Sequence, residues 1–243
     1  MAVMVVTGAS SGIGRAVAEM ALADGWQVAC IARREDRLRE VALLGDGIAL
    51  PCDVRSEAAV EAAFTAVMER FGRIDVLFNN AGIFPRGALI DDVSLAEWQE
   101  VVDVNLTGMF LCARAAFVRM RAQTPQGGRI INNGSIAGQV PRPMSLAYSV
   151  TKHAINGMTK QMALDGRGLN IATGQVDIGN ARTDLAAQME KGVPQADGSV
   201  RPEPMMDVRE AARAVMHMAS LPPGANVLQM TVMATEMPFV GRG

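Results

Sequence analysis

The chain has 243 residues, of which 49% are hydrophobic and 20% are charged, and its formal net charge is −2. This length fits one large domain with a full hydrophobic core, so we expect residues 1–243 to form a single domain. The near-neutral charge makes nucleic acid and an anionic membrane surface poor candidates as partners.

Short apolar segments alternate with longer segments of helical periodicity along the chain. The predicted strands are Val3–Thr7, Gln27–Ala32, Gly47–Pro51, Asp75–Asn79, Arg129–Asn133, Asn170–Val176 and Asn226–Val232. The predicted helices are Gly12–Asp24, Arg37–Leu44, Glu57–Phe71, Leu95–Ala122, Ala147–Arg167 and Asp207–Ser220. Several strands are apolar throughout, which is typical of a parallel sheet covered on both faces. The alternation predicts an α/β fold: a doubly wound parallel sheet of about seven strands with helices on both faces, Rossmann-like.

The first predicted strand runs directly into a glycine-rich turn that opens the first helix. Glycines permit a tight turn and a close approach of the backbone to a pyrophosphate, and the helix N-terminus offers unpaired N–H groups to the anion. The alternative is a glycine-rich turn that binds nothing, but its position after the first strand favours phosphate binding. The candidate cofactor-binding residues in this turn are Gly8, Ser10, Ser11, Gly12, Ile13 and Gly14.

The second predicted strand is followed by two arginines, Arg33 and Arg34. In a dinucleotide-binding fold, a carboxylate at this place would bind the ribose 2′-hydroxyl group of NAD. No carboxylate stands there, and guanidinium groups suit a phosphate through charge-assisted hydrogen bonds. The sequence therefore favours NADP over NAD, with NAD still possible, because both arginines could simply be the solvated start of the next helix.

Tyr148 is the only tyrosine of the chain, and Lys152 follows it at i+4. Residues at this spacing share one face of a helix, so the Lys152 ammonium would lie beside the Tyr148 phenol. A nearby cation lowers the pKa of a phenol, which makes its hydroxyl usable as an acid and base near neutral pH. Taken alone, the same spacing is more often a surface pair.

Other features concern compartment, metals and mobility. The three cysteines, Cys30, Cys52 and Cys112, form no CxxC pair, which argues for reduced thiols in a cytoplasmic protein and against a zinc or disulfide framework. We expect no bound metal. No basic leader opens the sequence, and no apolar run reaches the ~18 residues of a membrane span.

The stretch 185–206 is rich in glycine and proline, and we expect it to form a mobile lid over the substrate.

In order along the chain, these motifs resemble the classical short-chain dehydrogenase/reductase family, and the resemblance spans almost the whole sequence. The family's glycine motif matches Gly8, Gly12 and Gly14, and its Asn-Asn-Ala-Gly signature matches residues 79–82. By resemblance, the catalytic candidates are Asn105, Ser135, Tyr148 and Lys152. The resemblance also gives these cofactor-binding candidates: Asp53, Val54, Asn80, Ala81, Gly82, Tyr148, Lys152, Gly179, Ala181 and Thr183.

The resemblance implies a division of roles in hydride transfer. Tyr148 would give its proton to a carbonyl oxygen that Ser135 holds by a hydrogen bond. Lys152 would lower the pKa of Tyr148 and hold the nicotinamide ribose. Asn105 would kink its helix and hold a water near Lys152. The family commonly assembles through its two long helices, so we expect a homo-oligomer, a tetramer or a dimer.

The chain departs from the family after the sixth predicted strand. Ile178 stands where the family has a proline, which removes a fixed φ from the loop that would contact the nicotinamide. Gln175 and Asp177, just before it, are polar where the family has an apolar run. The sequence offers no physical account of these two residues.

The sequence thus predicts an oxidoreductase that transfers a hydride between a nicotinamide dinucleotide and a ketone or secondary alcohol. The ligands expected are NADP(H), or alternatively NAD(H), and a small-molecule ketone or alcohol. One alternative is a dinucleotide-binding sensor without redox turnover, although such proteins typically lose the tyrosine or the lysine. Another is an isomerase or dehydratase that uses its bound cofactor transiently.

Overall fold

Seven parallel strands form one sheet in the order β3-β2-β1-β4-β5-β6-β9. The computed structural model describes residues 1–183 and 192–240. The strands are β1 Val3–Thr7, β2 Gln27–Ala32, β3 Gly47–Pro51, β4 Val76–Asn79, β5 Gly128–Asn133, β6 Ile171–Gly179 and β9 Gln229–Met233. The strand order changes direction between β1 and β4, and in open α/β sheets ligands bind at the carboxyl ends of the strands beside such a switch point.

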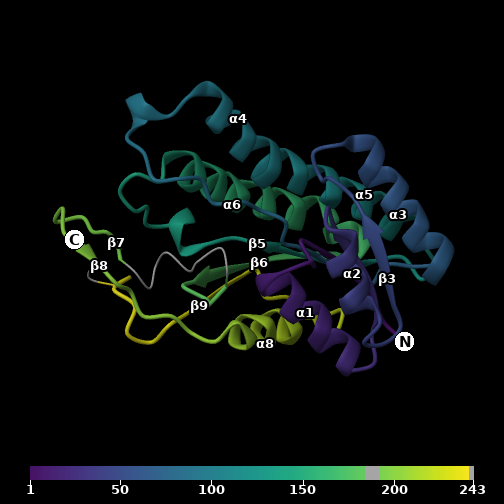
Figure 1. The fold of residues 1–243 in the computed structure, drawn as a ribbon. Coiled ribbons are helices and arrows are strands. Elements are labelled where there is room, and N and C mark those ends of the chain that lie inside the picture. Colours follow the sequence, from purple (N-terminus) through teal and green to yellow (C-terminus); the bar gives the residue numbers. More distant parts are fainter. Residues whose placement is uncertain (184–191, 241–243) are drawn as a thin grey trace.

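Helices cover both faces of the sheet (Figure 1). They are α1 Gly12–Ala23, α2 Glu35–Ala42, α3 Glu57–Phe71, α4 Leu95–Val102, α5 Gly108–Ala122, α6 Leu146–Gly166 and α8 Val208–Ala219. Side chains alternate across each strand: on β1, Met4 and Val6 pack with α1 and α8, whereas Val3 and Val5 pack with α3 and α5. The predicted doubly wound α/β fold is confirmed.

The predicted helix Leu95–Ala122 is interrupted in its middle. α4 ends at Val102, residues Asp103–Thr107 form a π-helical turn, and α5 begins at Gly108. The whole 28-residue stretch is long and apolar enough to cross a membrane by length and composition, but half of its most apolar window is buried inside the fold. A buried amide, Asn105, lies in the π turn, so this stretch packs as a core helix on the sheet.

The sixth strand extends three residues beyond its predicted end at Val176. Ile178 pairs with Val232 of β9, and Gly179 pairs with Met233. Isoleucine keeps the backbone N–H and the variable φ that proline lacks, so the strand register can continue through this position. β6 therefore stays paired with β9 from Gln175 through Asp177 to Gly179.

The segment that follows β6 is partly described. Residues 192–206 contain a short antiparallel ribbon, β7 Val193–Pro194 with β8 Val200–Arg201. Buried Glu203 accepts a hydrogen bond from Asn180 and forms an ion pair with Arg142. Residues 184–191 lie outside the described residues, so the mobile lid at 185–206 remains a prediction.

Candidate active site

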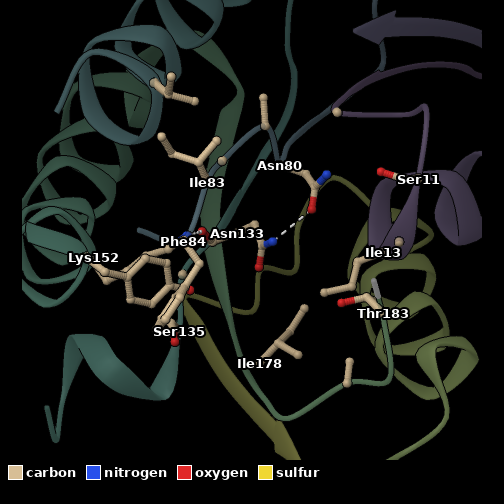
Figure 2. A pocket seen from close by; sticks show the side chains of 18 of the residues that line it. Ser11, Ile13, Asn80, Ile83, Phe84, Asn133, Ser135, Lys152, Ile178 and Thr183 are labelled. Atoms are coloured by element: carbon tan, nitrogen blue, oxygen red, sulfur yellow. Dashed lines mark hydrogen bonds between the residues drawn. The ribbon is translucent and has the colours of Figure 1, made fainter. Parts of the chain in front are cut away.

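A cavity of about 330 Å³ opens at the carboxyl ends of β1, β4, β5 and β6. Seventeen of the predicted site residues line it: Gly8, Ser10, Ser11, Gly12, Ile13, Arg33, Arg34, Asp53, Val54, Asn80, Ala81, Gly82, Ser135, Tyr148, Lys152, Ala181 and Thr183. Three predicted residues, Gly14, Asn105 and Gly179, are not part of its lining. Figure 2 shows Ser11, Ile13 and Thr183 on one side, Phe84, Ser135 and Lys152 on the other, and Asn133 between them.

The glycine turn brings backbone close to backbone at the start of α1. Gly8 and Gly12 adopt positive φ angles of 70° and 55°, a region that side chains with a Cβ rarely adopt. A Cβ on Gly14 would lie 2.4 Å from the Gly8 carbonyl oxygen, so Gly14 serves helix–strand packing behind the cavity. The Ser11 side chain makes no capping bond, which leaves the first N–H groups of α1 available to an anion.

The two arginines after β2 have different neighbours. The Arg34 guanidinium donates hydrogen bonds to Ser10 Oγ at 3.0 Å and to Ser11 Oγ at 2.8 Å. Arg33 is close to Asp53, whose pKa is lowered mainly by hydrogen bonds from Arg55 and to a smaller degree by the charge of Arg33. Arg34 is therefore the arginine that borders the glycine turn.

Three of the four predicted catalytic side chains, Ser135, Tyr148 and Lys152, meet at the other end of the cavity. The buried Ser135 and the Tyr148 phenol share a hydrogen bond. The Lys152 ammonium donates to the Asn133 carbonyl oxygen at 2.7 Å and lies 5.5 Å from the centroid of the Tyr148 ring. The Phe84 ring packs on the same phenol with a centroid distance of 4.7 Å.

The electrostatics of this group differ from the prediction for Tyr148. Burial raises the pKa of Tyr148 above its ordinary value, and the Ser135 hydrogen bond and the charge of Arg142 lower it only in part. Burial also lowers the pKa of Lys152 to about 8. The predicted lowering of the Tyr148 pKa is not found, because desolvation of the phenol outweighs the hydrogen bond with Ser135 and the charge of Arg142.

Asn105 acts on the cavity through the loop after β4. Its Oδ1 accepts a hydrogen bond from the Ile83 N–H at 2.7 Å, and its Nδ2 donates to the Ile83 carbonyl at 2.9 Å. A Cβ on Gly82 would lie 3.3 Å from the same Oδ1. The predicted local distortion of the helix at Asn105 is present as the π turn, and the predicted contact with a water stays a prediction.

Asn133 and Arg142 are site residues that the sequence reasoning missed. Asn133 Nδ2 donates to Asn80 Oδ1 at 2.8 Å (Figure 2), whereas its buried Oδ1 has no partner among the described residues. Two consecutive asparagines at the end of an apolar strand were the available signal. Arg142, from the loop before α6, lines the cavity and is paired with buried Glu203.

These features fit a dinucleotide. The turn has no Cβ at the points where a phosphate would approach, Arg34 adds a cation there, and Asn133 Oδ1 is an acceptor that a hydroxyl or amide donor could satisfy. The described residues contain no group of three or more His, Cys, Asp or Glu side chains arranged for a metal ion. The cavity can therefore hold a phosphate-bearing cofactor at one end and present a serine, a phenol and an ammonium at the other.

Comparison with known proteins identifies the family. The family model described as short chain dehydrogenase matches residues 2–194. A 3beta-hydroxysteroid dehydrogenase from Mediterraneibacter gnavus is 39% identical over 168 residues, which cover 67% of this chain and 60% of that protein. The match thus spans less than two thirds of that relative's length.

Solved structures agree in fold over nearly the whole chain. A single-residue variant of the actinorhodin polyketide ketoreductase, solved with NADPH, has a TM-score of 0.86 and 30% identity, with 96% of each chain covered. A 3-ketoacyl-(acyl-carrier-protein) reductase from Brucella melitensis, complexed with NADH, has a TM-score of 0.85 and 26% identity, covering 95% of this chain and 96% of that one. The chain belongs to the short-chain dehydrogenase family.

Proposed function

We propose that the chain is a nicotinamide-dependent oxidoreductase that interconverts a ketone and a secondary alcohol, with NADP(H) as the favoured cofactor. The observation that carries the proposal is the meeting of Ser135, Tyr148 and Lys152 in one cavity with the glycine turn. The names of the relatives, which are dehydrogenases and reductases, support the same reaction class.

The chain's own residues would handle the proton and the developing charge. A bound reduced nicotinamide would supply the hydride to the carbonyl carbon. Tyr148 would give its phenolic proton to the carbonyl oxygen while the Ser135 hydroxyl donates a hydrogen bond to that oxygen. Lys152, with a pKa of about 8, would remain mostly protonated at neutral pH and keep a positive charge beside the phenol. In alcohol oxidation, Tyr148 would accept the proton instead.

The preference for NADP is supported by the surroundings of the glycine turn. Arg34 reaches the hydroxyls of Ser10 and Ser11, so a ribose 2′-phosphate placed there would gain a charge-assisted partner. No carboxylate directly follows β2 to take the 2′-hydroxyl group of NAD. Relatives with NADH and with NADPH are both known, so the two cofactors are compared directly in the experiments.

The substrate cavity is bordered by both apolar and polar groups. Ile83, Phe84 and Ile178 offer apolar surface, and the ion pair of Arg142 with Glu203 is close to neutral as a unit. We infer a ketone or secondary alcohol of moderate size, and no nucleic acid or membrane partner. The protein would act in the cytoplasm.

The decisive variant is Tyr148→Phe, which removes only the phenolic oxygen. We expect turnover to fall by about 10²–10⁴-fold, the usual contribution of a positioned acid, while cofactor binding changes little. A panel of ketones and secondary alcohols is followed at the nicotinamide absorbance with each cofactor, and binding is measured by calorimetry. If wild type binds cofactor but converts nothing in the panel, the redox proposal fails in favour of a sensor. Full activity of Tyr148→Phe would reject the acid role.

A further inference from the structure

Asp177 on β6 is a fully buried carboxylate that lies directly below the Ser135 turn. Its side chain is 0% exposed. Oδ1 accepts from the Ser135 N–H at 3.0 Å and from Gln175 Nε2 at 2.6 Å, and Oδ2 accepts from Gln139 Nε2 at 2.8 Å and Gln229 Nε2 at 2.7 Å. All four partners are donors, which is the environment of an ionised, acceptor-only carboxylate.

The turn above this carboxylate is shaped to receive it. A Cβ on Gly134 would lie 2.1 Å from Asp177 Oδ1 and 2.5 Å from Gln175 Nε2. Gly134 does not have a positive φ, so the glycine is needed for space and not for backbone conformation. Gly134 and Asp177 are 43 residues apart in the sequence, yet the space left by the glycine is filled by the carboxylate. Both residues lie beside Ser135 in the structure.

Few charged groups of residues 1–183 and 192–240 surround Asp177. Helix α6 contributes Lys152 and Tyr148, on both of which the charge of Asp177 acts, and the loop before α6 carries Arg142, which acts on Tyr148 and is paired with Glu203. Among the described residues, the groups hydrogen-bonded to Asp177 are neutral: the Ser135 N–H and Gln139 from the turn after β5, Gln175 from β6 itself, and Gln229 from β9. Burial lowers the pKa of Lys152 and raises that of Tyr148, and the negative charge of Asp177 acts upward on both, against the effect of burial on Lys152 and along with it on Tyr148.

We propose that Asp177 is a positioning residue of the candidate active site, which fixes the Ser135 backbone and places a buried negative charge beside the group formed by Ser135, Tyr148 and Lys152. The effect on turnover rests on the proposed function of this cavity. The effect on the ionisation of Tyr148 does not, because it needs neither substrate nor cofactor.

The test uses the fact that Tyr148 is the only tyrosine in the chain. Tyrosinate absorbance in the ultraviolet, followed against pH, reports this phenol alone. Asp177→Asn removes the charge at nearly constant shape, since the Gln139 and Gln229 amides can turn their oxygens toward the new NH₂. We expect the Tyr148 titration midpoint to move to lower pH. In the reductive reaction, the alkaline limb of the rate profile should move to lower pH too, which lowers turnover above it by about threefold to tenfold.

Asp75→Asn is the matched control. Asp75 also accepts a backbone N–H, that of Val3 at 2.8 Å, but it lies at the amino ends of β1 and β4, away from the cavity at their carboxyl ends. The Asp75→Asn variant should change neither the midpoint of the Tyr148 titration nor the alkaline limb of the rate profile. An Asp177→Asn midpoint that moves no further than the Asp75→Asn midpoint would overturn the proposal.

A second variant keeps the proposal testable if Asp177→Asn does not fold. Gln229 is exposed on β9, so Gln229→Glu can be made without disturbing the core. It adds a carboxylate beside Asp177 and should move the Tyr148 midpoint to higher pH, the opposite direction. No movement in this variant would count against the electrostatic role. Suppose that Tyr148→Phe loses activity but the Tyr148 midpoint is unchanged in Asp177→Asn and Gln229→Glu. The proposed function would then stand, and the role of Asp177 would be rejected.

Discussion

Arg33 and Arg34 follow each other in the sequence but are not equivalent in space. Only Arg34 reaches the serine hydroxyls of the glycine turn. Arg34→Ala should raise the KM for NADP by about 10–100-fold, because hydrogen bonds to charged groups are worth ~1.5–3 kcal/mol, and should leave the KM for NAD nearly unchanged. Arg33→Ala is the control with a smaller effect. Steady-state kinetics with NADP and with NAD measure these KM values. An equal rise in the KM for NADP in Arg34→Ala and Arg33→Ala would show that Arg34 is not the partner of the 2′-phosphate.

Lys152 makes the stability of the chain depend on pH in a defined window. Its pKa is lowered from 10.5 to about 8, so between these values the folded state binds fewer protons than the unfolded state. The free energy of unfolding therefore rises with pH across this window. Relative to Lys152→Met, wild type should gain about 2 kcal/mol between pH 7 and pH 10.

Denaturant unfolding at several pH values measures that gain. Lys160→Met, at an exposed lysine on the same helix, is the control and should follow wild type. If the free energies of unfolding of Lys152→Met and wild type change in parallel from pH 7 to pH 10, folding does not lower the pKa of Lys152.

At the scale of the element, the π turn between α4 and α5 couples a helix to a loop. Asn105 satisfies both backbone groups of Ile83. Asn105→Ala should lower the free energy of unfolding by about 1–3 kcal/mol, because it leaves the part-buried N–H and carbonyl groups of Ile83 without their partner. Gln99→Ala on α4 removes an exposed side-chain hydrogen bond and should change stability by less than about 0.5 kcal/mol. Equal losses in urea unfolding would show that the Asn105 bonds are not needed.

At the scale of the whole molecule, two helices on the same face of the sheet expose apolar side chains. Phe110 and Val118 on α5 are 47% and 46% exposed, and Val150 and Leu164 on α6 are 42% and 57% exposed. We propose that copies of the chain associate through these helices as a dimer or tetramer. Phe110→Glu should lower the mass measured by light scattering, whereas Leu43→Glu, at an exposed position after α2, should not. An unchanged mass for Phe110→Glu would exclude α5 from the interface.

Local patterns were enough to predict much of the molecule. Six of the seven strands began within a residue of their predicted start, because strands buried on both faces are apolar throughout and are bounded by turns. The glycine turn and the Tyr148–Lys152 spacing were readable for the same reason: each depends on neighbours in the sequence. The start of β9 was missed because Asn226 instead binds Arg129 and the Thr173 carbonyl, which lie far away in the chain.

What the sequence alone determined is therefore the family, the doubly wound sheet and the place of the cavity. Only the tertiary structure decided which arginine borders the glycine turn, that burial raises the pKa of Tyr148, and why Gln175 and Asp177 are polar. These properties arise from contacts between distant segments, such as Gly134 against Asp177 and Arg142 against Glu203. Burial and charge act through space, and no periodicity along the chain encodes them.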